Sequence, residues 1–143
     1  MKYFTNQKNY DQPANLFVAN FIGLPPMNLI DTVVKDGFVE NEYFKLPLNE
    51  SNRQLLRSYI GKTIVMGIRP EDIYEGGSIP FTVNINENLG QNSLVHGDVN
   101  GKKMICKFKS WTNYCEKDHI QIHFDEEKLH FFDKETTQAI HKW

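Results

Sequence analysis

The sequence predicts a mainly β fold: a small OB-type barrel of about five strands, with an extra hairpin and two short helices. Three observations support this class. Residues 79–132 read as five short strands, the connections between them carry tight-turn signals such as Asn100-Gly101, and no long helical pattern interrupts the run.

The first elements are a tail and a short helix. Residues 1–12 are polar and aperiodic, and we interpret them as a tail or the stub of an upstream domain, followed by one domain over 13–143. Pro13 suits a first helical turn and Gly23 a helix end. The residues at helical spacing between them are Leu16, Phe17, Asn20 and Phe21.

A hairpin and a second helix come next. Strand-like stretches 27–34 and 38–46 flank Lys35-Asp36-Gly37, and Asp-Gly is a hairpin signal. Residues 51–60 predict a short helix capped by Asn49 or Ser51. Its apolar side consists of Leu55, Leu56, Tyr59 and Ile60.

The tripeptide Gly61-Lys62-Thr63 raises the question of a phosphate-binding loop. The full pattern needs a glycine at the position of Leu56, and the loop should follow a strand and open a helix. Here a helix comes first and a strand, 63–68, comes after. Gly61 is therefore predicted to end the helix in a left-handed conformation.

The remaining chain is a series of strands and turns. The turn 69–72 follows strand 63–68, and Gly76-Gly77 makes a further break. The predicted strands beyond it are 79–89, 92–99, 102–109, 119–125 and 128–132.

Composition describes a globular protein. The 143 residues are 40% hydrophobic and 13% aromatic, which is enough for one domain with its own core. The net charge of −2 argues against a main role in gripping nucleic acid, which usually needs a strongly basic surface. No run is long and apolar enough for a membrane span and no signal peptide opens the chain, so we expect a cytoplasmic setting.

No pattern predicts a catalytic, cofactor or metal site. His119 and His123 share one face of a strand without a third ligand, and Cys106 and Cys115 have no metal or redox spacing. The adjacent carboxylates Glu71-Asp72 lie in a turn, whereas acid–base catalysis needs groups that converge on a cleft.

Three stretches resemble one family. They are DQPANLFVANFIGLPPMNLI at 11–30, MGIRPEDI at 66–73, and NLGQNSLVHG at 88–97 with KLHFFDKETTQAI at 128–140. In this order they are similar to the C-terminal region of the ATP-binding subunit of carbohydrate-uptake ABC transporters of the maltose type. The resemblance implies a transport-associated OB (TOBE) domain with a regulatory and dimerisation role.

The resemblance also implies partners and a location. We expect a homodimer, contact with the ATPase domain and the permease of the complex, and a possible regulatory protein, at the cytoplasmic face of the cell membrane. The family's catalytic motifs lie upstream and are absent here, so we expect no enzyme activity and no cofactor. The segment 5–10 departs from the family, with Asn6 and Lys8 in place of a proline and a glutamate.

Two groups of residues carry the functional predictions. The resemblance makes one stretch a structural motif, with Arg69 tying the turn to neighbouring backbone; it consists of Gly67, Ile68, Arg69, Pro70, Glu71 and Asp72. Phe38, Trp111 and Tyr114 are the candidate protein contacts. The alternative function is a stand-alone OB-type module that binds an oligonucleotide, with bases stacked on aromatic side chains, or a small ligand.

Overall fold

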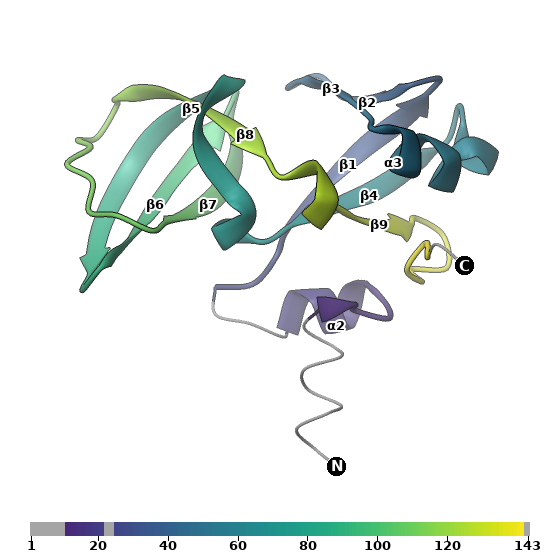
Figure 1. Cartoon of the computed structure of the whole chain (residues 1–143), viewed down its shortest axis with the longest axis horizontal. Coiled ribbons are helices and arrows are strands. Elements are labelled where there is room, and N and C mark those ends of the chain that lie inside the picture. Colours follow the sequence, from purple (N-terminus) through teal and green to yellow (C-terminus); the bar gives the residue numbers. More distant parts are fainter. Residues whose placement is uncertain (1–10, 22–24, 142–143) are drawn as a thin grey trace, which may run out of the picture. The chain divides into compact units, whose positions relative to one another are not determined.

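Two β-sheets account for about half of the residues that the structure describes, 11–21 and 25–141, in this computed structural model (Figure 1). The chain divides into two compact units. The described residues up to Gly67 and from Leu129 to His141 form the first, which we call the outer unit, and residues 68–128 form the second, the inserted unit. The mainly β class with two short α-helices is confirmed for the described residues.

The outer unit contains a five-stranded sheet in the order β3-β2-β1-β4-β9. Its strands are β1 (Asn28–Lys35), β2 (Phe38–Glu40), β3 (Lys45–Pro47), β4 (Thr63–Ile68) and β9 (His130–Asp133). β1 and β2 form the expected hairpin, with Gly37 at φ +91° in its turn. Only glycine adopts this conformation at little cost, which explains the Asp-Gly signal.

The predicted strand 38–46 is two strands because the side chain of Asn41 makes a turn. Its Oδ1 accepts hydrogen bonds from the backbone N–H groups of Tyr43 (2.8 Å) and Phe44 (3.0 Å). Such a side chain replaces a ladder hydrogen bond and reverses the chain. β2 and β3 therefore pair with each other, with Val39 opposite Leu46.

The helices are shorter than expected. α2 (Leu16–Phe21) begins three residues after Pro13 and is capped by Asn15, whose Oδ1 accepts from the N–H of Val18 at 3.0 Å. Phe17 is exposed and Ala19 is fully buried. The predicted end at Gly23 lies outside the described residues.

α3 (Glu50–Leu55) starts one residue before the predicted range 51–60, after Asn49, which is one of the two predicted caps. The Oδ1 of Asn49 accepts from the N–H of Asn52 at 2.8 Å, which satisfies one of the free donors of the first turn. A 3₁₀ turn, η1 (Arg57–Tyr59), follows. Leu56 is fully buried, but Ile60 is exposed, which corrects the predicted apolar side: the helical period ends before Ile60.

Gly61 adopts φ +88°, as predicted for a residue that ends a helix. Its N–H donates to the carbonyl of Val34 (2.8 Å), and the N–H of Lys62 donates to the carbonyl of Tyr59 (2.8 Å). The backbone N–H groups of this segment therefore bond to β1 and η1.

The inserted unit contains a four-stranded antiparallel sheet in the order β7-β6-β5-β8. Its strands are β5 (Ile73–Leu89), β6 (Asn92–Val99), β7 (Lys102–Phe108) and β8 (His119–Phe124). Two 3₁₀ turns flank them, η2 (Pro70–Asp72) and η3 (Glu126–Lys128). Asn100 and Gly101 both have positive φ, as a two-residue hairpin turn requires.

β5 starts six residues earlier than predicted. Gly76 and Gly77, with φ of +90° and +106°, do not end the strand but form an irregularity within it, and the pairing with β8 resumes at Ile79. A bulge of this kind bends the strand without ending it.

The five predicted strands of the second half do not share one sheet. β5 to β8 do, whereas β9 pairs with β4 in the outer unit, with Val65 opposite Phe132. The residues of β9 predict a strand but not which strand it pairs with. Its partner β4 lies about sixty residues earlier in the sequence, so the local pattern could not identify it.

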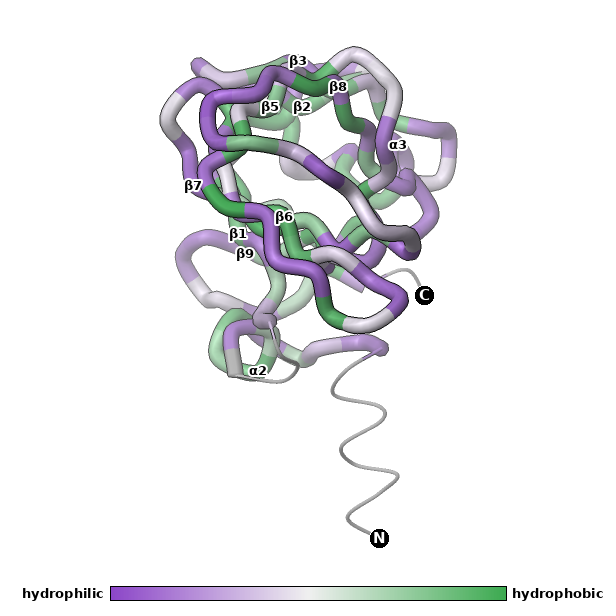
Figure 2. Tube along the Cα trace, turned by 90° about the vertical axis from the view of Figure 1, so that its left-hand side faces the viewer, coloured by the Kyte–Doolittle hydropathy of each residue, from purple (hydrophilic) through white to green (hydrophobic). Residues whose placement is uncertain are grey.

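Each unit has its own apolar core, and Figure 2 shows hydrophobic colour along the strands and hydrophilic colour at many of the turns between them. In the outer unit, buried Ala19, Met27, Val65 and Phe132 pack together. In the inserted unit, Phe81, Val83, Val95, Cys106 and Ile122 are among the fully buried side chains. Burial of one such large apolar side chain contributes about 1.5–3 kcal/mol.

Candidate protein-interaction surface

Residues 109–118 connect β7 to β8, and hydrogen bonds fix the first part of this loop to β5 and β6. The buried Ser93 hydroxyl donates to Oδ1 of Asn88 (2.6 Å) and accepts from the N–H of Thr112 (3.0 Å). The side chain of Asn86 donates to the carbonyl of Thr112 at 3.0 Å and accepts from its hydroxyl. Thr112 is thus held on both sides.

The end of the loop is held by β5. The N–H of Lys117 donates to the carbonyl of Val83 (2.7 Å), and the N–H of Val83 donates to the carbonyl of Asp118 (2.9 Å). The carboxylate of Asp118 accepts from the N–H of Cys115 (2.8 Å). A loop fixed at both ends presents its side chains with little loss of entropy on binding.

This loop exposes Trp111, whose side chain is 64% exposed. Its indole N–H donates to the carbonyl of Gly90 in the β5–β6 turn. Two apolar residues of β5 are also exposed, Ile85 (59%) and Leu89 (49%). We call Trp111 and the β5–β6 turn residues Leu89 and Gly90 the Trp111 surface, because the indole bonds to this turn. Ile85 points to the opposite face of β5 from Asn86, to which the loop is bound, so it does not belong to this surface. A large aromatic ring with a fixed polar end is the kind of residue that anchors protein interfaces.

Tyr114 is half-buried, and its hydroxyl donates to a carboxylate oxygen of Glu75. Burial, followed by this hydrogen bond, raises the pKa of Tyr114 from 10.0 to about 12. The hydroxyl therefore stays protonated and remains a donor to β5 at neutral pH. Its predicted role as a protein contact stays a prediction.

Phe38 lies in β2 of the outer unit and is half-buried. The ammonium group of Lys45 lies 4.0 Å from the centre of its ring, so that a cation already covers one face. Trp111 and Tyr114 share one loop of the inserted unit, and Phe38 does not belong to that group. Its contact role also stays a prediction.

The predicted motif 67–72 spans the end of β4 and η2. A side chain at Gly67 would lie 3.2 Å from Cγ of Met27 and 3.3 Å from the ring of Phe132, so this glycine permits close packing in the outer unit. In the inserted unit, Arg69 and Pro70 are buried, and the carbonyl of Arg69 accepts from the N–H of Asp72 at 2.9 Å. These contacts are compatible with the predicted structural role of Gly67 to Asp72.

Asp72 links this turn to the end of β8, because its carbonyl accepts from the N–H of Asp125 at 2.9 Å. Burial, and next the adjacent charge of Glu71, raise the pKa of its carboxyl group, while Lys128 and Arg69 act in the opposite direction. Opposing influences of this kind occur in partly buried turns and do not by themselves indicate catalysis.

The patterns in the sequence did not reveal that Ile85 and Leu89 are exposed. Ile85 alternates with the buried Phe81 and Val83, which places it in the core of an ideal strand. The pairing of β5 with β6 shifts between Val83 and Ile85. This irregularity exposes Ile85, and no local signal marks it.

Within the described ranges, no three His, Cys, Asp or Glu side chains come together in a way that could hold a metal ion. His119 and His123 are exposed and make separate contacts, His119 with the hydroxyl of Thr82 (3.2 Å) and His123 with the carbonyl of Gly76 (3.3 Å). In the same part of the chain, no helix has the length and apolar character needed to cross a membrane.

Comparison with known proteins gives one family match and several relatives. Residues 23–73, which include β1 to η2, match the MalK OB fold domain. Over 92% of its length the chain is 40% identical to the trehalose/maltose import ATP-binding protein MalK of Thermococcus litoralis. It is also 33% identical to the oligosaccharides import ATP-binding protein MsmX of Bacillus subtilis and 36% identical to the sn-glycerol-3-phosphate import ATP-binding protein UgpC of Shigella boydii, again over 92% of the chain.

The match covers only part of these relatives. The chain spans 39% of the length of MalK and of MsmX and 38% of that of UgpC. The match to an OB fold domain agrees with the OB-type class that the sequence predicts, although it covers β1 to η2 rather than the run of strands from 79 to 132.

Proposed function

Because residues 23–73 match the MalK OB fold domain and the chain is similar to importer ATP-binding proteins over 92% of its length, we propose that it acts as the transport-associated OB domain of a sugar importer's ATP-binding subunit. In this role the domain pairs the ATP-binding subunits and regulates them. The observation that carries the proposal is the 40% identity to the trehalose/maltose import protein of Thermococcus litoralis.

The proposed role is non-catalytic. The only segment that suggests a nucleotide site is Gly61-Lys62-Thr63. In a phosphate-binding loop, free backbone N–H groups at the start of a helix face the phosphates. Here the N–H groups of Gly61 and Lys62 donate to Val34 and Tyr59, and a strand follows. This arrangement supports a structural role for the tripeptide.

The proposed mechanism is contact between two copies of the chain through the Trp111 surface. An interface gains most of its free energy from a few desolvated aromatic or apolar anchors. The hydrogen bonds of Asn86, Ser93 and Thr112 hold the loop in place before binding, which lowers the entropy cost of association. Tyr114 and Phe38 remain secondary candidates for the contact.

Within a whole transporter, the domain belongs to a pair of ATP-binding subunits that work with a permease at the cytoplasmic face of the membrane. A regulatory protein that docks on the domain would adjust the rate of transport. The related proteins are named as import ATP-binding proteins, which supports a role in transport, and the permease and the regulatory protein are part of the proposal.

Sedimentation velocity over 1–100 µM chain tests the pairing. We expect a monomer–dimer equilibrium, and we expect Leu89→Ala with Trp111→Ala to weaken association at least tenfold, which corresponds to about 1.4 kcal/mol. Phe17→Ala is the matched control, because it removes an exposed aromatic side chain from the outer unit.

Two results would count against this mechanism. A chain that stays monomeric at 100 µM has no self-association of the proposed kind. An equal loss of association in the Phe17→Ala control would show that the Trp111 surface is not the contact.

The transporter role has a separate test. An antibody raised against this chain is used on an extract of the native cells, and the mass of the detected protein is read from a blot. The proposal expects a band well over twice 16.7 kDa that co-purifies with a membrane permease. A band at 16.7 kDa without a permease contradicts it.

A further inference from the structure

A cavity of about 450 Å³ lies in the outer unit, between the β1–β2 turn and the helical segment α3–η1. Its lining is dominated by charged and polar side chains: Lys35, Asp36, Glu50, Arg53, Gln54 and Arg57. Of the apolar residues that line it, Ile60 is exposed and Leu56 is fully buried beneath the surface. The volume is in the range of small-molecule sites.

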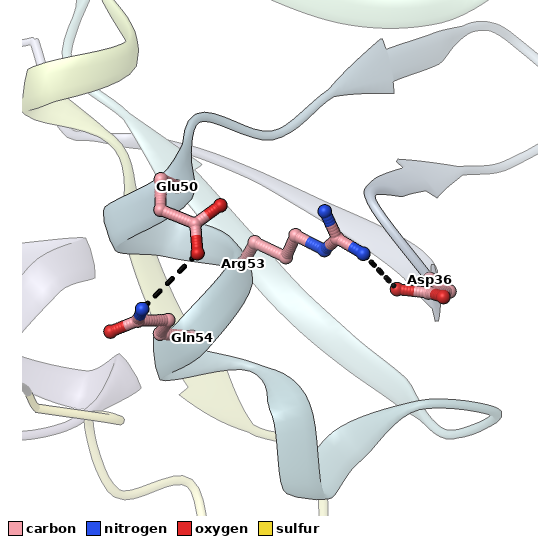
Figure 3. A network of polar contacts seen from close by, with 4 residues as sticks. All are labelled: Asp36, Glu50, Arg53 and Gln54. Carbon is pink, nitrogen blue, oxygen red and sulfur yellow. Dashed lines mark hydrogen bonds and ion pairs between the residues drawn. The ribbon is translucent and has the colours of Figure 1, made fainter.

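Both carboxylates of this cavity already have a donor (Figure 3). Asp36 Oδ1 accepts from Nη2 of Arg53 at 3.1 Å, and Glu50 Oε1 accepts from Nε2 of Gln54 at 3.1 Å. Figure 3 shows Arg53 reaching from α3 to Asp36 at the tip of the hairpin, whereas Glu50 and Gln54 bond along the helix. The acidic side chains are therefore occupied by neighbours in the lining.

Two cationic side chains of the lining form no ion pair with a carboxylate of the described residues. They are Lys35, at the end of β1, and Arg57, at the start of η1. The lining holds three cationic side chains and two carboxylates, so it is locally positive in a chain of net charge −2.

The backbone that carries these cations is fixed. Asn49 caps α3, the N–H of Leu56 donates to the carbonyl of Asn52 (3.0 Å), and the Leu56 side chain is fully buried. Arg53 lies in α3 and Arg57 in the adjoining η1, and both line the cavity. A guanidinium group matches the geometry of phosphate and carboxylate oxygens.

We propose that this cavity binds a small molecule with a phosphate or carboxylate group, held by Arg57 and Lys35 with Arg53 beside them. The exposed side chain of Ile60 contacts the rest of the ligand. This site is independent of the proposed pairing of subunits, because it uses residues of the outer unit alone and needs no second copy of the chain.

Isothermal titration calorimetry on the full 143-residue chain tests the site, with inorganic pyrophosphate and citrate as the two probes at constant ionic strength. We expect saturable binding of at least one probe with a Kd below about 1 mM. Tight binding of pyrophosphate alone assigns a phosphate ligand, and tight binding of citrate alone assigns a carboxylate ligand.

Variants locate the binding. Lys35→Gln with Arg57→Gln should raise the Kd at least tenfold, and Arg57→Lys should retain part of the affinity. The control is Lys103→Gln with Lys109→Gln, which removes the same charge from exposed positions of the inserted unit. Circular dichroism spectra of all variants establish that they are folded, as expected for exposed side chains.

Three outcomes overturn the proposal. The first is the absence of saturable heat with both probes. The second is an equal loss of affinity in the control, which indicates general attraction to positive charge. The third is binding of a poly-glutamate peptide without binding of either probe, which assigns the cavity to a protein partner. None of these results bears on the sedimentation test of the Trp111 surface.

Discussion

Ser93 is the residue on which the position of the 109–118 loop depends most. Its side chain has no exposed surface, and it is both the donor to Asn88 and the acceptor for the backbone of Thr112. Removal of the Ser93 hydroxyl leaves the N–H of the buried Thr112 without this acceptor, and an unsatisfied buried donor costs more than the hydrogen bond itself contributes.

We expect Ser93→Ala to lower the free energy of unfolding by about 1–3 kcal/mol. Urea unfolding measures the loss, and Ser58→Ala, at an exposed position of η1, is the control with the same chemical change. Equal stability of Ser93→Ala and the unchanged chain would mean that the loop is held by its other contacts alone.

Cys106 predicts how stability changes at high pH. Burial, and next the charge of Glu75, raise the pKa of this thiol from 9.0 to about 12. Below pH 9 the thiol is protonated in both the folded and the unfolded chain. Between pH 9 and pH 12 the unfolded chain loses the proton and the folded chain keeps it, so stability is lost as the pH rises.

For Cys106 alone, we expect the free energy of unfolding to fall by about 2 kcal/mol between pH 8 and pH 10.5. Urea unfolding at the two pH values measures this. Cys106→Ala should lose that part of the pH dependence, and an unchanged slope in this variant would assign the effect to other groups such as Tyr114.

At the scale of the elements, Gly97 in β6 shows why one strand position tolerates no side chain. A Cβ there would lie 2.6 Å from the ring of Phe81 and closer still to the backbone carbonyl of Thr82. The carbonyl belongs to the paired strand β5 and cannot move without opening the ladder.

We expect Gly97→Ala to destabilise the chain by about 1–3 kcal/mol through overpacking. Thermal unfolding gives the change, with Lys103→Ala, an exposed residue of the neighbouring β7, as the control. A variant that melts with the unchanged chain would show that β5 and β6 can separate at this point.

Elements with a complete local signal could be predicted. β4 matches its predicted bounds, and the turns at Gly37 and Asn100-Gly101 follow from residues that favour positive φ. The division of 38–46 depends on the side chain of Asn41, and the early start of β5 depends on how Gly76 and Gly77 fit against β8. The strand propensity of single residues predicts neither the division of 38–46 nor the early start of β5.

The candidate surface shows the same limit. Trp111 could be named as a candidate contact from its type and its place in a loop, and its contact role stays a prediction. The exposure of Ile85 could not be predicted, because it follows from a shift in the pairing of β5 with β6. The cavity beside α3 depends on the turn Lys35–Gly37 lying beside Arg53, which is seventeen positions away from Asp36 in the sequence.

For the molecule as a whole, the order of the segments along the chain determines when the outer unit can be completed. The outer unit is made of two segments, and its last strand, β9, is supplied after the inserted unit is complete. Phe131 and Phe132 of β9 are both buried, so the outer unit lacks part of its core until this strand is added.

A chain truncated after Lys128 should therefore keep one unit and lose the other. In hydrogen exchange followed by mass spectrometry, we expect amide protection to remain in β5 to β8 and to be lost in β1 to β4. A chain truncated after His141 is the control, since it retains β9. Retained protection of β1 to β4 without β9 would show that the outer unit folds without its final strand.

The pairing of Gly67 with His130 has a consequence for protein engineering. The two points at which the chain leaves and re-enters the outer unit are opposite each other on neighbouring antiparallel strands. Such a gap has the width of an ordinary hairpin turn. Segment 68–129 could therefore be excised and replaced by an Asn-Gly dipeptide, which leaves Gly67 and His130 as the pair that flanks a two-residue turn. A foreign domain with closely spaced ends could be grafted into the same place. The β4–β9 pair could thus carry different inserted domains without a change in the outer unit.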